Sequence, residues 1–162
     1  MVRPMKPEDR EAVLDIVRAT GMFTAIEIQC AEEQIDIFLG QPGQQDYSLV
    51  VAENDKGQVV GYMSYGPTPL AEGAYDIYWM AVAPGVQGRG HGRKLVSWLE
   101  DRVKDWGGRL ILIETSSQPK YERTRRFYLS LEYREVARIP DFYKPGDDRI
   151  TYAKYLESKE RN

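Results

Sequence analysis

The sequence is poor in the residues that build metal sites and disulfides: its 162 residues include one cysteine, Cys30, and one histidine, His91. A single cysteine cannot form an internal disulfide, and neither a CxxC pair nor a multi-histidine zinc site can be assembled. A Ser-His-Asp hydrolase would have to use His91, which lies in a glycine-rich stretch, and the chain has no GxSxG nucleophile elbow. We therefore expect no metal. Cys30 has apolar neighbours in a predicted helix, which favours a packed, buried thiol.

Long apolar runs are also missing. No segment reaches the roughly 20 apolar residues that a membrane-spanning helix needs, and Met1–Pro7 has no apolar stretch typical of a secretory signal. The formal net charge of −3 argues against a protein that holds nucleic acid through phosphate contacts, because such proteins are usually basic. These absences predict a cytoplasmic protein with no membrane partner and no nucleic-acid partner.

Hydrophobic periodicity predicts a mixed α/β chain. Some segments repeat apolar residues at helical spacing and carry capping signals, such as Thr24 followed three residues later by Glu27. Others are rich in β-branched and aromatic residues and end at turn-forming residues. Leu110–Glu114 is almost wholly apolar, which indicates a strand covered on both faces. We predict helices over residues 7–20, 25–39, 90–106 and 122–131, and strands over 2–5, 47–53, 58–65, 74–83, 110–114, 134–139 and 149–155. Strands on both sides of the central helix point to an α/β sandwich on one mixed sheet.

The most informative segment is glycine-rich and joins a predicted strand to a predicted helix, over residues 80–92. Backbone N–H groups at a helix start have no partner within the helix and lie at the positive end of its dipole. Glycines let the backbone approach a ligand closely and adopt positive φ. The segment therefore predicts a pyrophosphate cradle, and Arg89, Arg93 and Lys94 add positive charge beside it.

Three phosphate-binding motifs compete for this segment. The P-loop GxxxxGK[ST] fails because His91 stands where lysine is required, and the dinucleotide fingerprint GxGxxG fails because Arg93 stands at its third glycine. What fits is QxxGxG, formed by Gln87, Gly90 and Gly92. This motif, with its strand and helix, resembles the coenzyme A loop of the GNAT superfamily of N-acetyltransferases, [RQ]xxGx[GA]. The alternative is a glycine-rich turn that merely opens a helix.

Two later segments support the same resemblance. Arg125–Tyr133 is similar to the family's late helix and turn, AxxxYxxxG[FY], although Glu132 stands where the family usually has a glycine that suits a left-handed cap. Ile139–Tyr143 resembles the segment after the penultimate strand in ribosomal-protein N-terminal acetyltransferases. The resemblance covers almost the whole chain, from Val2 to Leu156.

The resemblance implies a GNAT-type three-layer α/β sandwich around a central mixed, mostly antiparallel sheet, with the whole chain, 1–162, as one domain. It implies acetyl-coenzyme A as cosubstrate, with the thioester carbonyl beside the central strand and the pyrophosphate on the glycine-rich loop. The residues implied in cofactor binding are Met80, Ala81, Val82, Gln87, Gly88, Arg89, Gly90, His91, Gly92 and Arg93.

The resemblance also implies two catalytic roles. Tyr128 would protonate the leaving thiolate. The alternative is that Tyr128 is an ordinary aromatic residue on a helix, with no catalytic role. Glu114 ends a run of four apolar residues, where a carboxylate needs a partner or a function, and some family members use a glutamate there as the general base. Strand alternation could equally direct Glu114 to solvent or to an arginine, and Asp76 is a second candidate for the base.

The predicted function is transfer of acetyl from acetyl-coenzyme A to a primary amine of a small molecule or peptide. The alternatives are a non-catalytic acyl-coenzyme A sensor and a nucleotide-binding module. By analogy with the family, Thr20–Thr24 and Pro140–Tyr143 border the acceptor pocket. The sequence does not choose among peptide, polyamine, amino acid and drug acceptors, and it leaves a homodimer open.

Overall fold

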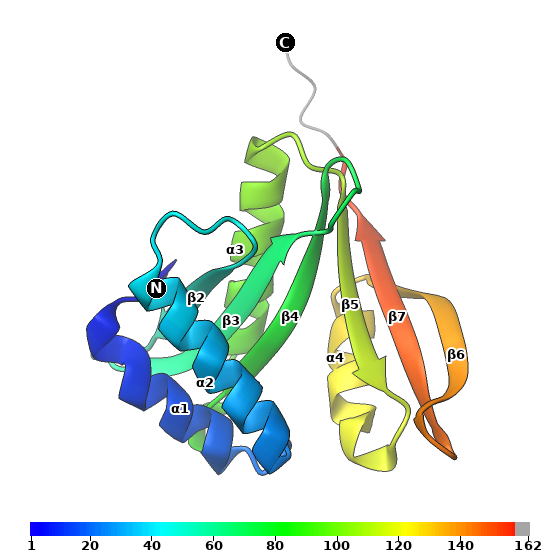
Figure 1. Ribbon diagram of the computed structural model, residues 1–162, viewed down its shortest axis with the longest axis horizontal. Coiled ribbons are helices and arrows are strands. Elements are labelled where there is room, and N and C mark those ends of the chain that lie inside the picture. Colours follow the sequence, from blue (N-terminus) through cyan, green and yellow to red (C-terminus); the bar gives the residue numbers. More distant parts are fainter. Residues whose placement is uncertain (158–162) are drawn as a thin grey trace. The chain divides into compact units, whose positions relative to one another are not determined.

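The computed structural model describes residues 1–157, and the chain forms two compact units (Figure 1). Unit 1 comprises Met1–Gly66 and Tyr78–Asp101, and unit 2 comprises Pro67–Ile77 and the chain from Arg102 onward. Strand β4 (Ala74–Val82) and helix α3 (His91–Asp105) contribute to both units. The seven strands are hydrogen bonded in the order β1-β2-β3-β4-β5-β7-β6, and most pairs are antiparallel, which confirms the predicted mixed α/β class. That one domain spans the chain stays a prediction.

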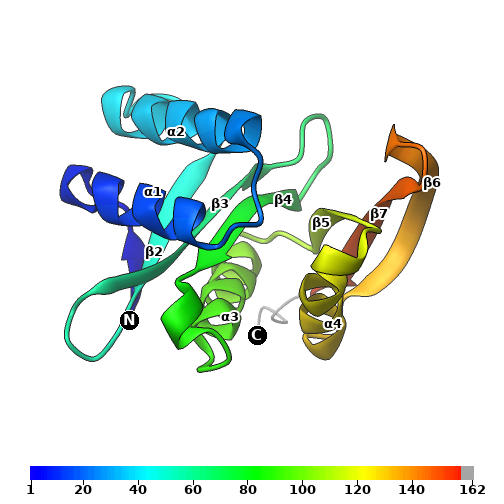
Figure 2. The same ribbon diagram turned by 90° about the horizontal axis from the view of Figure 1, so that it is seen from below.

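Unit 1 has helices on both faces of its strands. Its sheet contains β1 (Val2–Pro4), β2 (Ser48–Glu53), β3 (Val59–Pro67) and the second half of β4. Helices α1 (Arg10–Ala19) and α2 (Ala25–Gly40) lie on one side and α3 on the other (Figure 2). The core under α1 and α2 includes Val13, Val17, Leu49, Val51 and Tyr62. Burying each such apolar side chain contributes about 1.5–3 kcal/mol.

Local signals set the helix starts in unit 1. Thr24 and Glu27 form the predicted capping box, since Glu27 accepts a hydrogen bond from the Thr24 backbone (2.7 Å) and the Thr24 hydroxyl accepts one from the Glu27 backbone (3.3 Å). The helix predicted from Pro7 begins as a short 3₁₀ turn, η1 (Pro7–Asp9), before α1. Asp9 is buried at its end, where its carboxylate accepts two hydrogen bonds from Arg3.

Unit 2 is a four-strand sheet with one helix along it. The first half of β4 is parallel to β5 (Leu110–Ser116), and β7 (Asp147–Tyr155) is antiparallel to both β5 and β6 (Arg134–Lys144). The short turn η3 (Pro119–Tyr121) leads into α4 (Glu122–Ser130). Figure 2 shows α4 along one side of β5 and β7. The hairpin of β6 and β7 is longer than predicted, because pairing continues to Lys144 and Asp147.

Two expectations about burial are wrong. The strand predicted to be covered on both faces is covered on one: Ile111, Ile113 and Thr115 of β5 are buried, whereas Glu114 is exposed. Cys30 is exposed and not packed. In both cases the hydrophobicity of neighbouring residues was informative, but it did not show which side of the element another layer covers.

Glu132, which replaces the family's usual glycine, has φ of 70° directly after α4. A residue with a Cβ atom is strained in this left-handed conformation, at a cost of about 1–2 kcal/mol. The backbone therefore keeps the turn that glycine would favour, and Glu132 bears the strain.

Candidate active site

The glycine loop, Gln87–Gly92, connects β4 to α3 through the short 3₁₀ turn η2 (Pro84–Val86). Gly88 and Gly90 have φ of 80° and 85°, conformations that favour glycine. A Cβ atom built on Gly90 would meet no heavy atom within 4 Å, so the backbone there borders open space. Helix α3 begins at His91, and its first N–H groups therefore face the loop without partners in the helix. This is the predicted strand, turn and helix start.

Positive side chains surround the same loop. Arg89, Arg93 and Lys94 are exposed, while His91 is buried and its Nδ1 atom has no hydrogen-bond partner among the described residues. The Gln87 side chain instead donates a hydrogen bond to the Val82 carbonyl (3.0 Å), which ties the loop back to the end of β4. A glycine backbone at a helix start, with cations beside it, suits a pyrophosphate such as that of coenzyme A.

The three β4 residues assigned to the thioester do not have equivalent side chains. Ala81 is buried in the core under α1 and α2, so only its backbone is available to a ligand. Met80 and Val82 alternate with it along the strand and are partly exposed. These two residues can therefore offer side-chain contacts to a ligand.

Tyr128 lies on α4 in unit 2 and is almost fully buried. Its ring makes edge-on contacts with Phe127 and Tyr133, with centroids 5.1 Å and 5.9 Å away. Burial raises the pKa of Tyr128 well above its usual value of 10. The phenol therefore stays protonated at physiological pH and can always donate a hydrogen bond, although complete transfer of its proton to a thiolate is uphill.

Glu114 is not in the buried setting that a run of four apolar residues suggested. Its side chain is 50% exposed, and its Oε1 atom lies 3.7 Å from Nη1 of Arg149. Strand alternation places Glu114 on the opposite face of β5 from the buried Ile113 and Thr115. The structure thus realises the alternative in which Glu114 faces solvent and an arginine.

Asp76 shares that face of unit 2. It lies opposite Leu112 in the parallel pair of β4 and β5, and Glu114 is two residues further along β5. Burial raises the pKa of Asp76, and the Thr68 hydroxyl acts in the opposite direction. Two carboxylates in different environments therefore lie on one sheet face, which is a setting suited to accepting a proton.

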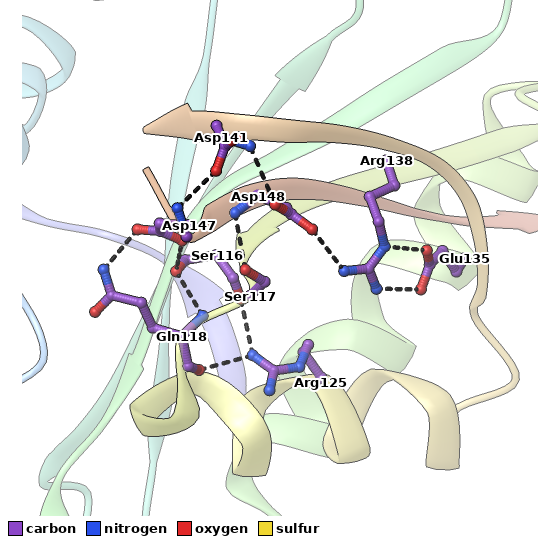
Figure 3. A network of polar contacts seen from close by, with 10 residues as sticks. Ser116, Ser117, Gln118, Arg125, Glu135, Arg138, Asp141, Asp147 and Asp148 are labelled. Atoms are coloured by element: carbon purple, nitrogen blue, oxygen red, sulfur yellow. Dashed lines mark hydrogen bonds and ion pairs between the residues drawn. The ribbon is translucent and has the colours of Figure 1, made fainter. Parts of the chain in front are cut away.

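A polar network fixes the end of the β6–β7 hairpin in unit 2 (Figure 3). The buried carboxylate of Asp147 accepts hydrogen bonds from the Ser116 hydroxyl (2.5 Å) and the Gln118 side chain (2.6 Å). Arg125 of α4 donates to the carbonyls of Ser116 and Gln118 (2.8 and 2.9 Å). The end of β5, the start of β7 and helix α4 are thereby joined through side chains far apart in the sequence.

Comparison with known proteins decides the family. The sequence profile of the acetyltransferase (GNAT) family matches residues 11–133. The chain belongs to the GNAT acetyltransferase family. A crystal structure from Desulfovibrio desulfuricans, itself assigned to the GNAT acetyltransferases, is 40% identical, with a TM-score of 0.90 over 97% of this chain and 99% of the other.

More distant GNAT structures share the fold. An aminoglycoside 6'-N-acetyltransferase complexed with coenzyme A is 19% identical, with a TM-score of 0.75 over 99% of both chains. The ribosomal-protein-S18-alanine N-acetyltransferase from Escherichia coli is 17% identical, with a TM-score of 0.76 over 100% of this chain and 97% of the other. No curated protein sequence matches the chain.

Sequence reasoning missed the contacts that are made across strands. The predicted loop residues are contiguous in unit 1, whereas Tyr128, Glu114 and Asp76 belong to unit 2. Arg149, the partner of Glu114, and the Asp147 network were not predicted, because no local motif marks residues that meet across strands. No helix in residues 1–157 is long and apolar enough to cross a bilayer. In the same residues no group of three His, Cys, Asp or Glu side chains is arranged to hold a metal ion.

Proposed function

We propose that this protein is an N-acetyltransferase that transfers acetyl from acetyl-coenzyme A to a primary amine of a small molecule or peptide. The observation that carries the proposal is the glycine loop at the start of α3, whose open backbone and positive φ values suit the cofactor pyrophosphate. Membership of the GNAT acetyltransferase family supports the same cosubstrate. The similarity to a coenzyme A-bound aminoglycoside 6'-N-acetyltransferase is consistent with an amine acceptor.

The reaction needs three functions from the residues of this chain: acceptance of a proton from the amine, hydrogen-bond donation to the leaving sulfur, and binding of the cofactor. Acetyl-coenzyme A supplies an activated acetyl group as a thioester. An amine that arrives as an ammonium first loses one proton, and we assign its acceptance to Glu114, with Asp76 as the alternative. The neutral nitrogen then bonds to the carbonyl carbon, the carbon–sulfur bond breaks to release the thiolate, and the second proton lost by the nitrogen ends on the sulfur. We assign hydrogen-bond donation to the leaving sulfur to Tyr128. Gln87–Arg93 would bind the pyrophosphate, and Met80, Ala81 and Val82 would border the thioester.

The direct test of the cofactor assignment is Gly90→Glu. The new side chain would place bulk and negative charge where phosphate is expected, and calorimetry on the folded variant should show that coenzyme A affinity is largely lost. Gly85→Ala is the matched control, because Gly85 also borders open space but has no positive φ. Unchanged affinity in Gly90→Glu contradicts the assignment of the loop.

The test of catalysis is acceptor-dependent release of the coenzyme A thiol, measured with a panel of amines. Acetylated amine in the product, identified by mass spectrometry, is the expected result. Coenzyme A binding without any acceptor-dependent thiol release would instead identify an acyl-coenzyme A sensor. Stabilisation by ATP or NAD and not by acetyl-coenzyme A, in a thermal-shift comparison, would identify a nucleotide-binding module.

A further inference from the structure

Arg149 is a partly buried cation with little to bind in its own chain. Its side chain is 28% exposed, yet its Nε atom is buried without a hydrogen-bond partner among the described residues. In residues 1–157 the one carboxylate within salt-bridge distance is Glu114, whose 3.7 Å separation from Nη1 is too long for a hydrogen bond. A guanidinium has five N–H donors, and removing it from water without acceptors is unfavourable.

The two acidic residues that precede Arg149 in the sequence, Asp147 and Asp148, form their hydrogen bonds with other groups. Asp147 is engaged by Ser116 and Gln118. Asp148 accepts hydrogen bonds from Arg138 (3.0 Å) and from the Asp141 backbone (3.1 Å). Both aspartates are thus committed to partners other than Arg149 (Figure 3).

The guanidinium is nevertheless held in a defined position. The ring of Phe142 lies over it, with Cζ of Arg149 4.4 Å from the ring centroid, and this stacking leaves the guanidinium edge for hydrogen bonds. Asp141 accepts a hydrogen bond from the Gly146 backbone (2.6 Å), which helps to fix the turn that carries Phe142. An arginine that is held by an aromatic ring, and whose ion-pair partner Glu114 lies beyond hydrogen-bond distance, is suited to a planar carboxylate, which it can bind with two parallel hydrogen bonds.

Glu114 supplies the opposite charge on the same sheet face. Arg149 pairs across the strands with Ser116, two residues after Glu114 in β5, so the two side chains are diagonal neighbours. An α-amino acid carries its amino group and carboxylate on one carbon. Its two charges are therefore separated by a distance similar to that between Glu114 and Arg149.

We propose that Arg149 and Glu114 together select an α-amino acid as acceptor, with its carboxylate on the Arg149 guanidinium and its amino group on Glu114. This inference rests on the proposed function, and it assigns Glu114 to recognition of the amine as well as to acceptance of its proton. Polyamines and peptide N-termini lack a carboxylate beside the reacting amine and would leave Arg149 unsatisfied.

The experiment compares each of the twenty protein L-amino acids with its carboxamide, using acetyl-coenzyme A and thiol detection. The pair has the same side chain and amine, and only the carboxylate is lost. At least one amino acid should exceed its carboxamide in kcat/KM by about tenfold or more, the effect of one charge-assisted hydrogen bond. This comparison is stringent, because the amine of a carboxamide is less basic and is more often neutral. On that ground alone the carboxamide would react faster than the acid.

Variants then assign the effect to the guanidinium. Arg149→Gln should bring the ratio of acid to carboxamide close to one, mainly through a higher KM for the acid, and Arg149→Lys should fall between because it keeps charge without the planar fork. Arg126→Gln is the control: it removes the same charge from an exposed arginine paired with Glu122 on α4, and it should leave the ratio unchanged.

The inference is overturned if the carboxamides react as well as the acids, or if none of the twenty amino acids is acetylated. Acetylation of other amines in that case would leave the proposed acetyltransferase function intact. The calorimetric test of the glycine loop bears on coenzyme A binding separately, so the two failures are distinguishable. If Arg149→Gln does not fold, Arg149→Lys, which keeps the positive charge, carries the assignment to the guanidinium, and the wild-type ratio still tests selection of a carboxylate.

Discussion

Glu114 and Arg149 lie 3.7 Å apart, Oε1 to Nη1, on one face of the unit 2 sheet. An alkyl amine has a pKa near 10 and is almost wholly protonated at pH 7, so a base must accept its proton before or during attack. If Glu114 is that base, Glu114→Gln should lower kcat/KM at neutral pH and spare coenzyme A binding. Raising the pH should restore part of the loss, because more amine is then neutral. Profiles of kcat/KM against pH that coincide for both proteins would exclude Glu114 and favour Asp76.

Tyr128→Phe removes one hydroxyl from a buried ring and should leave folding and coenzyme A affinity almost unchanged. We expect kcat to fall by about 10²-fold or more, the typical contribution of a positioned acid. Because burial raises the pKa of Tyr128, its ionisation should produce no loss of activity in wild-type profiles up to pH 10. Tyr155→Phe, at an exposed tyrosine, is the control. A turnover within twofold of wild type would give Tyr128 a packing role only.

Asp9 should make stability sensitive to acid. Hydrogen bonds from Arg3, opposed by burial, hold the pKa of Asp9 below its usual 3.8. A carboxyl with a depressed pKa stabilises the folded state above its unfolded pKa, and this contribution is lost as the pH falls through the folded pKa. Asp9→Asn should therefore cost about 2 kcal/mol at pH 7, and the difference from wild type should shrink below about pH 4.

Urea unfolding from pH 7 to pH 2.5 measures this difference. Asp55→Asn, in an exposed turn, should change stability little at any of these pH values. A gap between wild type and Asp9→Asn that stays constant down to pH 2.5 would mean that the charge of Asp9 does not contribute.

Glu132→Gly should stabilise the protein. Glycine removes the strain of a φ of 70° but has more freedom in the unfolded chain, so the net gain should be about 0.5–1 kcal/mol. The salt bridge to Lys154 (3.6 Å) that is lost is largely exposed and contributes little. Thermal unfolding should show a rise of about 1–4 °C. Arg126→Gly, at an exposed position inside α4, should lower stability instead. A lower Tm in Glu132→Gly would mean that the carboxylate compensates for the strain.

The helices, the strands and the glycine loop followed from short-range signals. Three features each depend on residues only a few positions apart: the capping box at Thr24 and Glu27, the end of β4 before Pro84, and the helix start at His91. Backbone conformation is determined mainly by such neighbours, and glycine spacing reports directly on positive φ. For this reason the sequence by itself determined the fold class and located the glycine loop between β4 and α3.

The surroundings of Glu114 and Arg149 were decided only by the tertiary structure. Glu114 was expected to be buried because four apolar residues precede it, but only one face of β5 is covered, and alternation turns Glu114 to the other. The contacts of Asp147 with Ser116 and of Arg149 with Glu114 join residues about thirty positions apart through strand register. Register is set by the pairing of whole strands, and a change of one residue would turn every side chain to the opposite face. No local pattern in the sequence carries that information, and so the pairing of Glu114 with Arg149 became visible only in three dimensions.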